Sequence, residues 1–300
     1  MHMASAVPTN NRPGDLVILL ALGLARLLLH VALNAHYGFH RDELAVFDDA
    51  RHLAWGYVAY PPLTPALGHV AQLLFGASLG GFRLFAALAQ CTAMVFAGLI
   101  ARELGGGRFA QLLAAVAVAA TPFSLLTASQ MEYTAFDSLW WVLLAWMVVR
   151  LINRDDPRWW LGIGLVIGLG MMTRYTMLFC VAGLAVGVLA TPMRRLLASP
   201  WLAGGVALSL LVFLPNGLWQ FNHDFIALDF LQSIHARDVR IGRTDGFLLQ
   251  QLYASTGPLL LPLWLGGLGW LAFAKAAARY RVFAWWYLAA LLLFAVAGGR

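Results

Sequence analysis

The chain has 300 residues, of which 61% are hydrophobic and only 11% are charged. A soluble domain carries about 25% charged residues, so this composition excludes a water-soluble globular protein. The formal net charge is +6, but the arginines are scattered among apolar stretches and form no basic stripe. We therefore interpret them as topology signals and expect no nucleic-acid partner.

Repeated apolar windows of about 15–25 residues predict an all-α polytopic membrane protein rather than a barrel of alternating strands. The nine expected spans cover residues 15–35, 82–101, 109–127, 134–151, 159–172, 175–191, 201–219, 247–273 and 282–298. A further apolar stretch, 63–80, is expected to lie along the membrane or re-enter it. The polar tail, 1–14, lacks a cleavage site after the first apolar run, so we expect that run to be a retained span.

The arginines also orient the chain. With the N-terminus in the cytoplasm, eleven basic residues and only four acidic residues fall in internal segments, as the positive-inside rule requires. These basic residues are Arg12, Arg102, Arg108, Arg150, Arg154, Arg158, Arg194, Arg195, Lys275, Arg279 and Arg281. Two external segments of the transmembrane domain 15–300, 36–62 and 220–246, are then long enough to hold a reacting site.

Residues 159–191 are barely long enough for two crossings at a rise of about 1.5 Å per residue. A single crossing would reverse everything downstream and leave Arg194 and Arg195 outside. Charge bias therefore favours two short helices that meet at Thr173–Tyr175. Short or broken helices often line cavities.

The first external segment predicts an amphipathic helix at the membrane surface. Between Asp42 and Tyr57, apolar residues recur at helical spacing, and the polar residues lie elsewhere around the helix. The apolar positions are Leu44, Phe47, Ala50, Ala54 and Tyr57.

Asp42 and Glu43 stand at the mouth of the first span, where charged side chains are costly near lipid and are usually functional. The structural alternative is an acidic cap on the following helix. In the functional interpretation, one carboxylate is a general base. The other positions it or holds a divalent cation such as Mg²⁺, Mn²⁺ or Zn²⁺.

Two arginines are candidate phosphate ligands. Arg83 opens the second span, where a helix N-terminus favours anions, although an arginine there can also simply extend to the interface. Arg174 lies between two short apolar helices and needs a partner. That partner is either a lipid phosphate or one of the acids Glu132 and Asp137.

Asp137 begins the fourth span, and it can cap that helix, pair with an arginine, or hold the Asp42 region in place. His223 and His235 in the second external segment have no metal-ligand spacing. We interpret them as loop residues and keep His235 as a candidate substrate contact.

Several motifs, in their order along the chain, resemble one family of membrane enzymes. They are Tyr37–Glu43, His52–Tyr57, Tyr60–Leu63, Phe82–Leu84, Ala101–Gly106, Thr173–Thr176 and Pro215–Gln220. From about residue 15 onward, the chain resembles a bacterial member of the glycosyltransferase C superfamily, in the family of protein O-mannosyltransferases and lipid A aminoarabinose transferases.

The resemblance implies a helix bundle of this superfamily and an inverting sugar transfer. The donor would be a polyprenyl-phosphate sugar and the acceptor a protein, lipid A or a glycan, on the extracytoplasmic face of the bacterial inner membrane. The first-loop acid would be Asp42, with Glu43 beside it, and the basic residues Arg83 and Arg174. Relatives continue with further helices, so we expect this chain to be C-terminally incomplete.

Two other functions stay open from the sequence. A transporter or flippase would also keep charges in the membrane, although the acids gather on one face and no paired interrupted helices occur in corresponding halves. A non-catalytic membrane subunit is the third interpretation, because the chain stops directly after a span.

Overall fold

The computed structural model describes residues 13–242 and 244–297, and every regular element in these ranges is helical. The α-helices are α1 (Pro13–Leu33), α2 (Arg41–Asp49), α3 (Leu63–Phe75), α4 (Leu79–Glu103), α5 (Arg108–Ala120), α6 (Pro122–Thr127), α7 (Tyr133–Arg154), α8 (Trp159–Met171), α9 (Met177–Leu189), α10 (Pro200–Asn222), α11 (Ile226–Arg240), α12 (Phe247–Gln250), α13 (Leu261–Phe273) and α14 (Arg281–Val296). The expected all-α polytopic class is confirmed. Most of the predicted tail, 1–14, and Arg243 of the second external segment lie outside the described residues.

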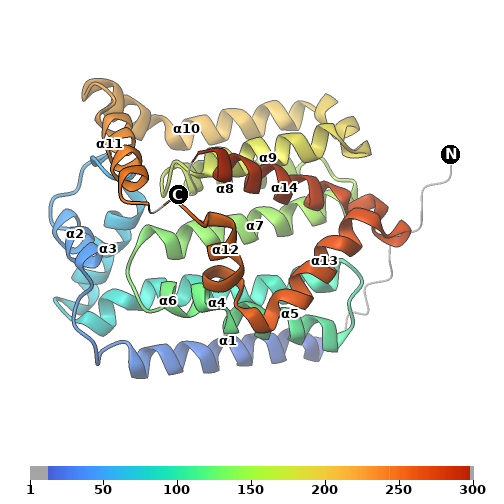
Figure 1. Ribbon diagram of the computed structural model, residues 1–300, viewed down its shortest axis with the longest axis horizontal. Helices are drawn as coiled ribbons and strands as arrows, with labels where there is room; N and C mark the ends of the chain where they lie inside the picture. Colours follow the sequence, from blue (N-terminus) through green and yellow to red (C-terminus); the bar gives the residue numbers. More distant parts are fainter. Residues whose placement is uncertain (1–12, 243, 298–300) are drawn as a thin grey trace.

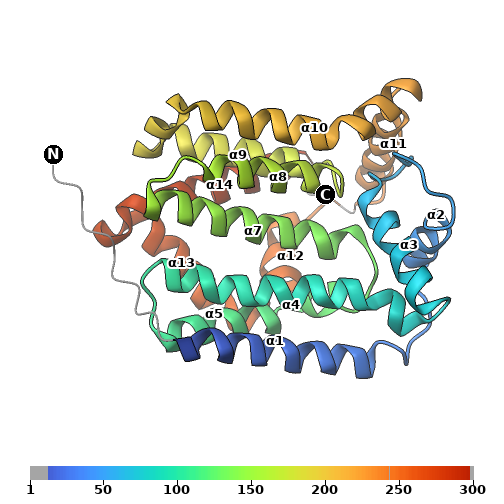
Figure 2. The same ribbon diagram turned by 180° about the vertical axis from the view of Figure 1, so that it is seen from behind.

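Most of the long helices run along the longest dimension of the molecule (Figure 1). The helices α2, α3 and α11 gather beyond one end of this bundle, at the left in Figure 1 and at the right in Figure 2. We call this end, which also holds the start of α7, the loop end. Both predicted external segments contribute to it.

Within residues 13–242 and 244–297, five helices are long and apolar enough to cross a membrane, namely Gly14–Leu33, Leu79–Glu103, Tyr133–Arg154, Pro200–Asn222 and Lys275–Val296. Two bent pairs, Met177–Leu189 with Pro192–Ala198 and Phe247–Tyr253 with Pro258–Phe273, raise the number to seven if each is one span. The expected spans 109–127 and 247–273 are each broken, and 159–172 and 175–191 form helices of 13 residues. The order of nine crossings therefore stays a prediction.

The break in 109–127 has a local cause. Thr121 has extended backbone, its Oγ1 accepts the N–H of Ser124 at 3.2 Å, and Pro122 starts the next helix. A proline has no N–H to continue the preceding helix, but it is well tolerated at a helix start. The pattern of apolar residues alone does not reveal this interruption.

The two short helices expected in 159–191 are present as α8 and α9, and Thr173 lies in the break between them. Its Oγ1 accepts a hydrogen bond from Trp140 Nε1 at 2.8 Å and donates one to the carbonyl of Leu169 at 2.8 Å. The break is therefore anchored to α7. Arg174 follows it at the loop end.

The apolar stretch 63–80 forms α3, which has 13 residues and packs against α2 and α4. Its length is about 20 Å at the rise of an α-helix, which is short of a hydrocarbon core of about 30 Å. This length agrees with the expectation that the segment does not cross the membrane.

Small residues bring several spans into backbone contact. A Cβ at Gly164 of α8 would overlap the backbone of Gly205 in α10, and a Cβ at Gly187 of α9 would lie 2.6 Å from the carbonyl oxygen of Val282 in α14. Such contacts are typical of membrane bundles, because lipid tails give helices no hydrophobic reason to associate. The pairs α8–α10 and α9–α14 are fixed in this way.

The amphipathic helix expected over 42–57 is present but shorter, because α2 ends at Asp49. The hydroxyl of Tyr57 accepts the N–H of Ala54 at 3.1 Å and lies 3.1 Å from the carbonyl oxygen of Asp49, to which it donates. This side chain closes a loop where further helical turns were expected. The buried face of α2 holds Glu43 and Val46, whereas Leu44 is exposed.

Candidate active site

Arg83, at the start of α4, is buried and forms an ion pair with Glu43. Its Nε lies 2.8 Å from Oε1 and its Nη2 2.6 Å from Oε2 of that carboxylate. The remaining N–H groups donate to the carbonyl oxygens of Asn34 at 2.7 Å, Gly38 at 2.8 Å and Tyr37 at 3.3 Å. All five N–H donors of a guanidinium are thus used. This side chain holds the first external segment together, which favours the structural alternative for Arg83; its binding of a substrate phosphate stays a prediction.

Glu43 is fully buried and does not reach the surface. Besides Arg83, its carboxylate accepts the backbone N–H of His40 at 2.9 Å and that of Met131 at 2.9 Å. The contact with His40 is one half of a capping box at the start of α2, which satisfies amides that a helix start leaves free. Of the two roles expected for the acid pair, Glu43 therefore fits the positioning one.

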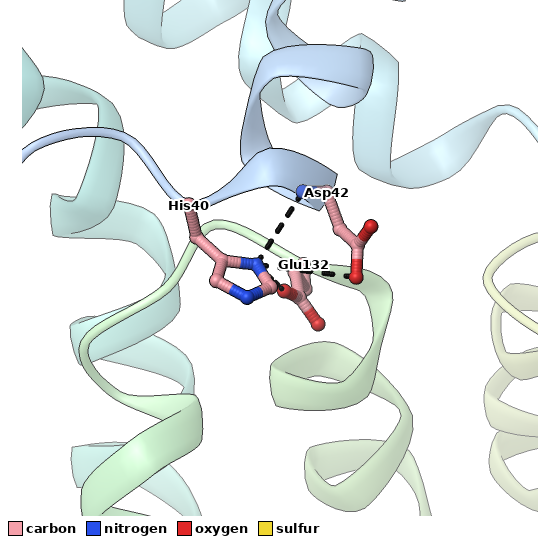
Figure 3. A group of neighbouring side chains, drawn as sticks. All are labelled: His40, Asp42 and Glu132. Atoms are coloured by element: carbon pink, nitrogen blue, oxygen red, sulfur yellow. Dashed lines mark hydrogen bonds and ion pairs between the residues drawn. The ribbon is translucent and has the colours of Figure 1, made fainter.

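Asp42 points the other way, and its side chain is 50% exposed. It belongs to a cluster with His40 and Glu132, in which one ligand atom from each residue lies within 4.8 Å of the others. His40 Nδ1 lies 3.2 Å from Glu132 Oε1 and 3.9 Å from Asp42 Oδ2. Figure 3 shows the imidazole between the start of α2 and the start of α7.

Glu132 comes from the residue that precedes α7, and its side chain is only 17% exposed. Burial raises the pKa of Glu132, the neighbouring Asp42 raises it further, and His40 opposes the shift. Glu132 therefore keeps its proton to a higher pH than an ordinary glutamic acid. A proton on Glu132 favours its 3.2 Å contact with His40 Nδ1, which also accepts the backbone N–H of Asp42 at 3.4 Å.

Sequence reasoning considered Glu132 only as an ion-pair partner of Arg174 and missed its place in the cluster with Asp42. A signal was available, because Glu132 directly precedes one apolar span and Asp42 lies a few residues after another, at the same predicted membrane face. What the sequence does not show is that the two segments meet.

Arg174 lies next to the same cluster. Its guanidinium carbon is 4.9 Å from the centre of the Tyr133 ring, and Tyr133 follows Glu132 in the chain. Its Nη1 lies 3.9 Å from Oδ2 of Asp137, which also accepts from Thr176 Oγ1 at 3.3 Å. Among the described residues, none forms a hydrogen bond with this guanidinium, which is 31% exposed. Arg174 thus has a loose acidic partner and donors that are free for a ligand.

His235 does not join the cluster. It lies on α11 with an exposed side chain, and it forms no hydrogen bond or ion pair with the other candidate residues that the structure describes. The structure therefore unites Asp42 with Glu132 and places Arg174 and Asp137 alongside, while His235 stays apart.

A long apolar groove of about 640 Å³ lies between α8, α9 and α10. Its walls include Ile163, Ile167, Leu178, Val181, Val206 and Leu210. At one end it reaches Tyr175 and Gln220, whose hydroxyl and amide nitrogen lie 2.9 Å apart. Because Tyr175 follows Arg174, the groove ends beside this loosely held cation; a second cation, Arg41, is exposed and donates to Asp42 Oδ1 at 3.0 Å.

Comparison with known proteins identifies a family. Residues 59–219 match the model of a family described as dolichyl-phosphate-mannose-protein mannosyltransferase. The match includes Arg83, Glu132, Asp137 and Arg174 and begins after Asp42 and Glu43. Neither the search of curated proteins nor that of solved structures gave a match. Because the matched residues make up more than half of the chain, the protein belongs to the dolichyl-phosphate-mannose-protein mannosyltransferase family, within the glycosyltransferase C superfamily.

Proposed function

We propose that this protein transfers a sugar, with inversion, from a polyprenyl-phosphate-linked donor to a protein, lipid A or glycan acceptor. The observation that carries the proposal is the arrangement at the loop end. There, the exposed Asp42 carboxylate and the Arg174 guanidinium lie next to the successive residues Glu132 and Tyr133, beside the end of a long apolar groove.

The groove suits the lipid part of such a donor. A polyprenyl phosphate cannot leave the bilayer, so its enzyme needs an apolar path that opens on polar groups. Lipid tails gain little hydrophobic free energy when they move from the bilayer onto a protein. The groove would therefore orient the chain by shape and packing, while Arg174 would bind the phosphate through its charge and its planar donors.

In the proposed step, an acceptor hydroxyl attacks the anomeric carbon on the face opposite the phosphate. The new C–O bond forms as the bond to the phosphate oxygen breaks, and its electron pair stays on the phosphate. Asp42 takes the hydroxyl proton as general base. Arg174 stabilises the negative charge that grows on the leaving phosphate, so no acid has to protonate it.

The contacts of the two neighbouring acids favour Asp42 over Glu43 as the base. Asp42 is half-exposed, whereas Glu43 is fully buried and accepts four hydrogen bonds. A base has to come within hydrogen-bond reach of the acceptor hydroxyl. Glu132, which is mostly buried beside Asp42, would orient His40 and the acceptor.

A divalent cation such as Mg²⁺, Mn²⁺ or Zn²⁺ would be held by His40, Asp42 and Glu132. Carboxylate oxygens suit all three ions and imidazole nitrogen suits Zn²⁺ best, and the three ligand atoms are already within 4.8 Å of one another. A bound cation would add positive charge beside the phosphate. The role of Arg174 does not depend on it.

The proposed location is the bacterial inner membrane, with the N-terminus in the cytoplasm and the site on the extracytoplasmic face. Several arginines pair with acids at the end of the bundle opposite to the loop end. These pairs are Arg108–Asp15 at 2.6 Å, Arg150–Glu103 at 2.7 Å and Arg195–Asp155 at 3.1 Å. The positive-inside rule favours the cytoplasm for that end.

A transfer assay with defined donors tests the proposal. Membranes that contain the wild-type protein would receive radiolabelled polyprenyl-phosphate mannose, glucose or aminoarabinose, and matched membranes without the protein would serve as controls. We expect label to leave the lipid only when the protein is present. A folded, monodisperse protein that transfers label from none of these donors would contradict the proposal.

A further inference from the structure

Asn34 lies between the two segments that carry the acid cluster. It directly follows α1, it is only 4% exposed, and both its backbone carbonyl and its side-chain nitrogen form hydrogen bonds. Its backbone carbonyl oxygen accepts a hydrogen bond from Arg83 Nη1 at 2.7 Å. Its side-chain Nδ2 donates to the carbonyl oxygen of Ala128 at 3.0 Å.

Ala128 and Met131 bound the short connection that presents Glu132. Ala128 caps the end of α6, and α7 begins at Tyr133. The amide of Met131 donates to Glu43 Oε1 at 2.9 Å. The connection is thus held at Ala128 by Asn34 and at Met131 by Glu43, directly before Glu132.

Both attachments lead to the same ion pair. Arg83 binds Glu43 through its side chain and Asn34 through the backbone carbonyl. Asp42 is the chain neighbour of Glu43, and Glu132 is the chain neighbour of Met131. One buried group of contacts therefore fixes two acids that are 90 residues apart in sequence.

We propose that Asn34 is a positioning residue that sets the separation of Glu132 from Asp42 and His40. The Asn34 side-chain nitrogen bonds to the C-cap residue of another helix, so its role goes beyond that of an ordinary helix cap. The consequence for catalysis rests on the proposed function, in which Asp42 is the base. A displacement of about 1 Å in such a site can lower a rate by about 100-fold.

Asn34→Leu removes the donor and keeps a similar volume. The matched control is Asn153→Leu, near the end of α7 away from the loop end. There, Asn153 Nδ2 likewise donates to a backbone carbonyl, that of Glu103, at 2.7 Å. Asn34→Asp, which keeps the shape and removes the donor, replaces the leucine variant if that variant does not fold.

The first readout is amide hydrogen exchange of the full chain in lipid nanodiscs. We expect exchange at Met131 and Glu132 to become about tenfold faster in Asn34→Leu, as the loss of a buried hydrogen bond allows, and to stay unchanged in Asn153→Leu. Unchanged exchange in Asn34→Leu would overturn the proposal. This readout needs no enzymatic activity. It therefore tests whether Asn34 holds the connection before Glu132 in place even if no sugar transfer is found.

The second readout uses transfer kinetics of wild type, Asn34→Leu, Glu132→Gln and the double variant. We expect Asn34→Leu to lower kcat by about 10- to 100-fold with little change in KM, and to add no further loss on top of Glu132→Gln. A purely structural role would give additive losses. Additive losses would therefore refute the positioning role while leaving the proposed transferase activity standing.

Discussion

Glu43 and Arg83 form a buried ion pair in which Nη2 lies 2.6 Å from Oε2 and Nε lies 2.8 Å from Oε1. The pair lies directly beside the exposed Asp42, so two adjacent acids have different environments and different roles. Burying two charges is tolerable here because backbone carbonyls and amides complete their hydrogen bonds. The first external segment is therefore a rigid support for the exposed cluster.

This pair predicts a large effect of Glu43→Gln on stability. The substitution keeps the shape but leaves the Arg83 charge buried without a counter-charge, which costs about 3–5 kcal/mol. Thermal unfolding of the purified protein in detergent measures the effect. Asp48→Asn, which changes an exposed acid on the same helix, should change stability by about 0.5 kcal/mol or less. Equal unfolding temperatures for Glu43→Gln and wild type would show that the pair does not support the fold.

The raised pKa of Glu132 predicts a pH dependence of stability. The folded state holds a proton that the unfolded state releases above its ordinary pKa of 4.5. This contribution is fully present below that value and is lost as pH rises through the raised pKa. Unfolding temperatures should be measured with a chelator present, from below pH 4.5 upward. They should fall as pH rises in wild type, and fall less in Glu132→Gln. Identical pH profiles would mean that the pKa of Glu132 is not raised.

Arg174 is predicted to act on the donor more than on the fold. A guanidinium that is 31% exposed and 3.9 Å from its acidic partner contributes about 1 kcal/mol or less to stability. A charged hydrogen bond to a phosphate is worth about 1.5–3 kcal/mol, so Arg174→Gln should raise KM for the donor by about 10- to 100-fold. Donor titrations and melting curves separate the two roles. Lower stability with an unchanged KM would identify Arg174 as the structural partner of Asp137.

The apolar groove predicts that a large side chain on α10 slows transfer only where it lines the groove. Val206→Trp would fill the groove, whereas Leu211→Trp places the same side chain on α10 at a position that does not line it. We expect the first variant to reduce transfer from a long-chain polyprenyl donor by about tenfold or more, because the lining residues cannot make room without strain. The second should transfer at the wild-type rate. Equal rates in both variants would exclude the groove as the donor path.

Much of the architecture follows from the sequence, because apolar windows and arginine placement are local signals. The same signals do not show where a long apolar window breaks. The break at Thr121 depends on one capping side chain and a proline, and the end of α2 depends on a contact from Tyr57. Both are details of a few atoms inside otherwise favourable patterns.

The site was predictable only in part for a related reason. Asp42 and Arg174 stand out because each is a charge beside an apolar segment. The roles of Glu43 and Arg83 depend on a contact across 40 residues, and that of Glu132 depends on its meeting with His40 across 92 residues. No spacing in the chain encodes these meetings. The place of Arg83 at a helix start predicts a phosphate ligand, whereas its contacts across the fold favour a structural role.

The central claim is that Asp42 is the base of a sugar transfer, and the rate of transfer by Asp42→Asn tests it most directly. With the donor that the wild-type protein uses, we expect kcat to fall by about 10²- to 10⁴-fold, with unchanged donor affinity and unfolding temperature. Asp48→Asn should keep the wild-type rate. Full transfer activity in Asp42→Asn would contradict the account.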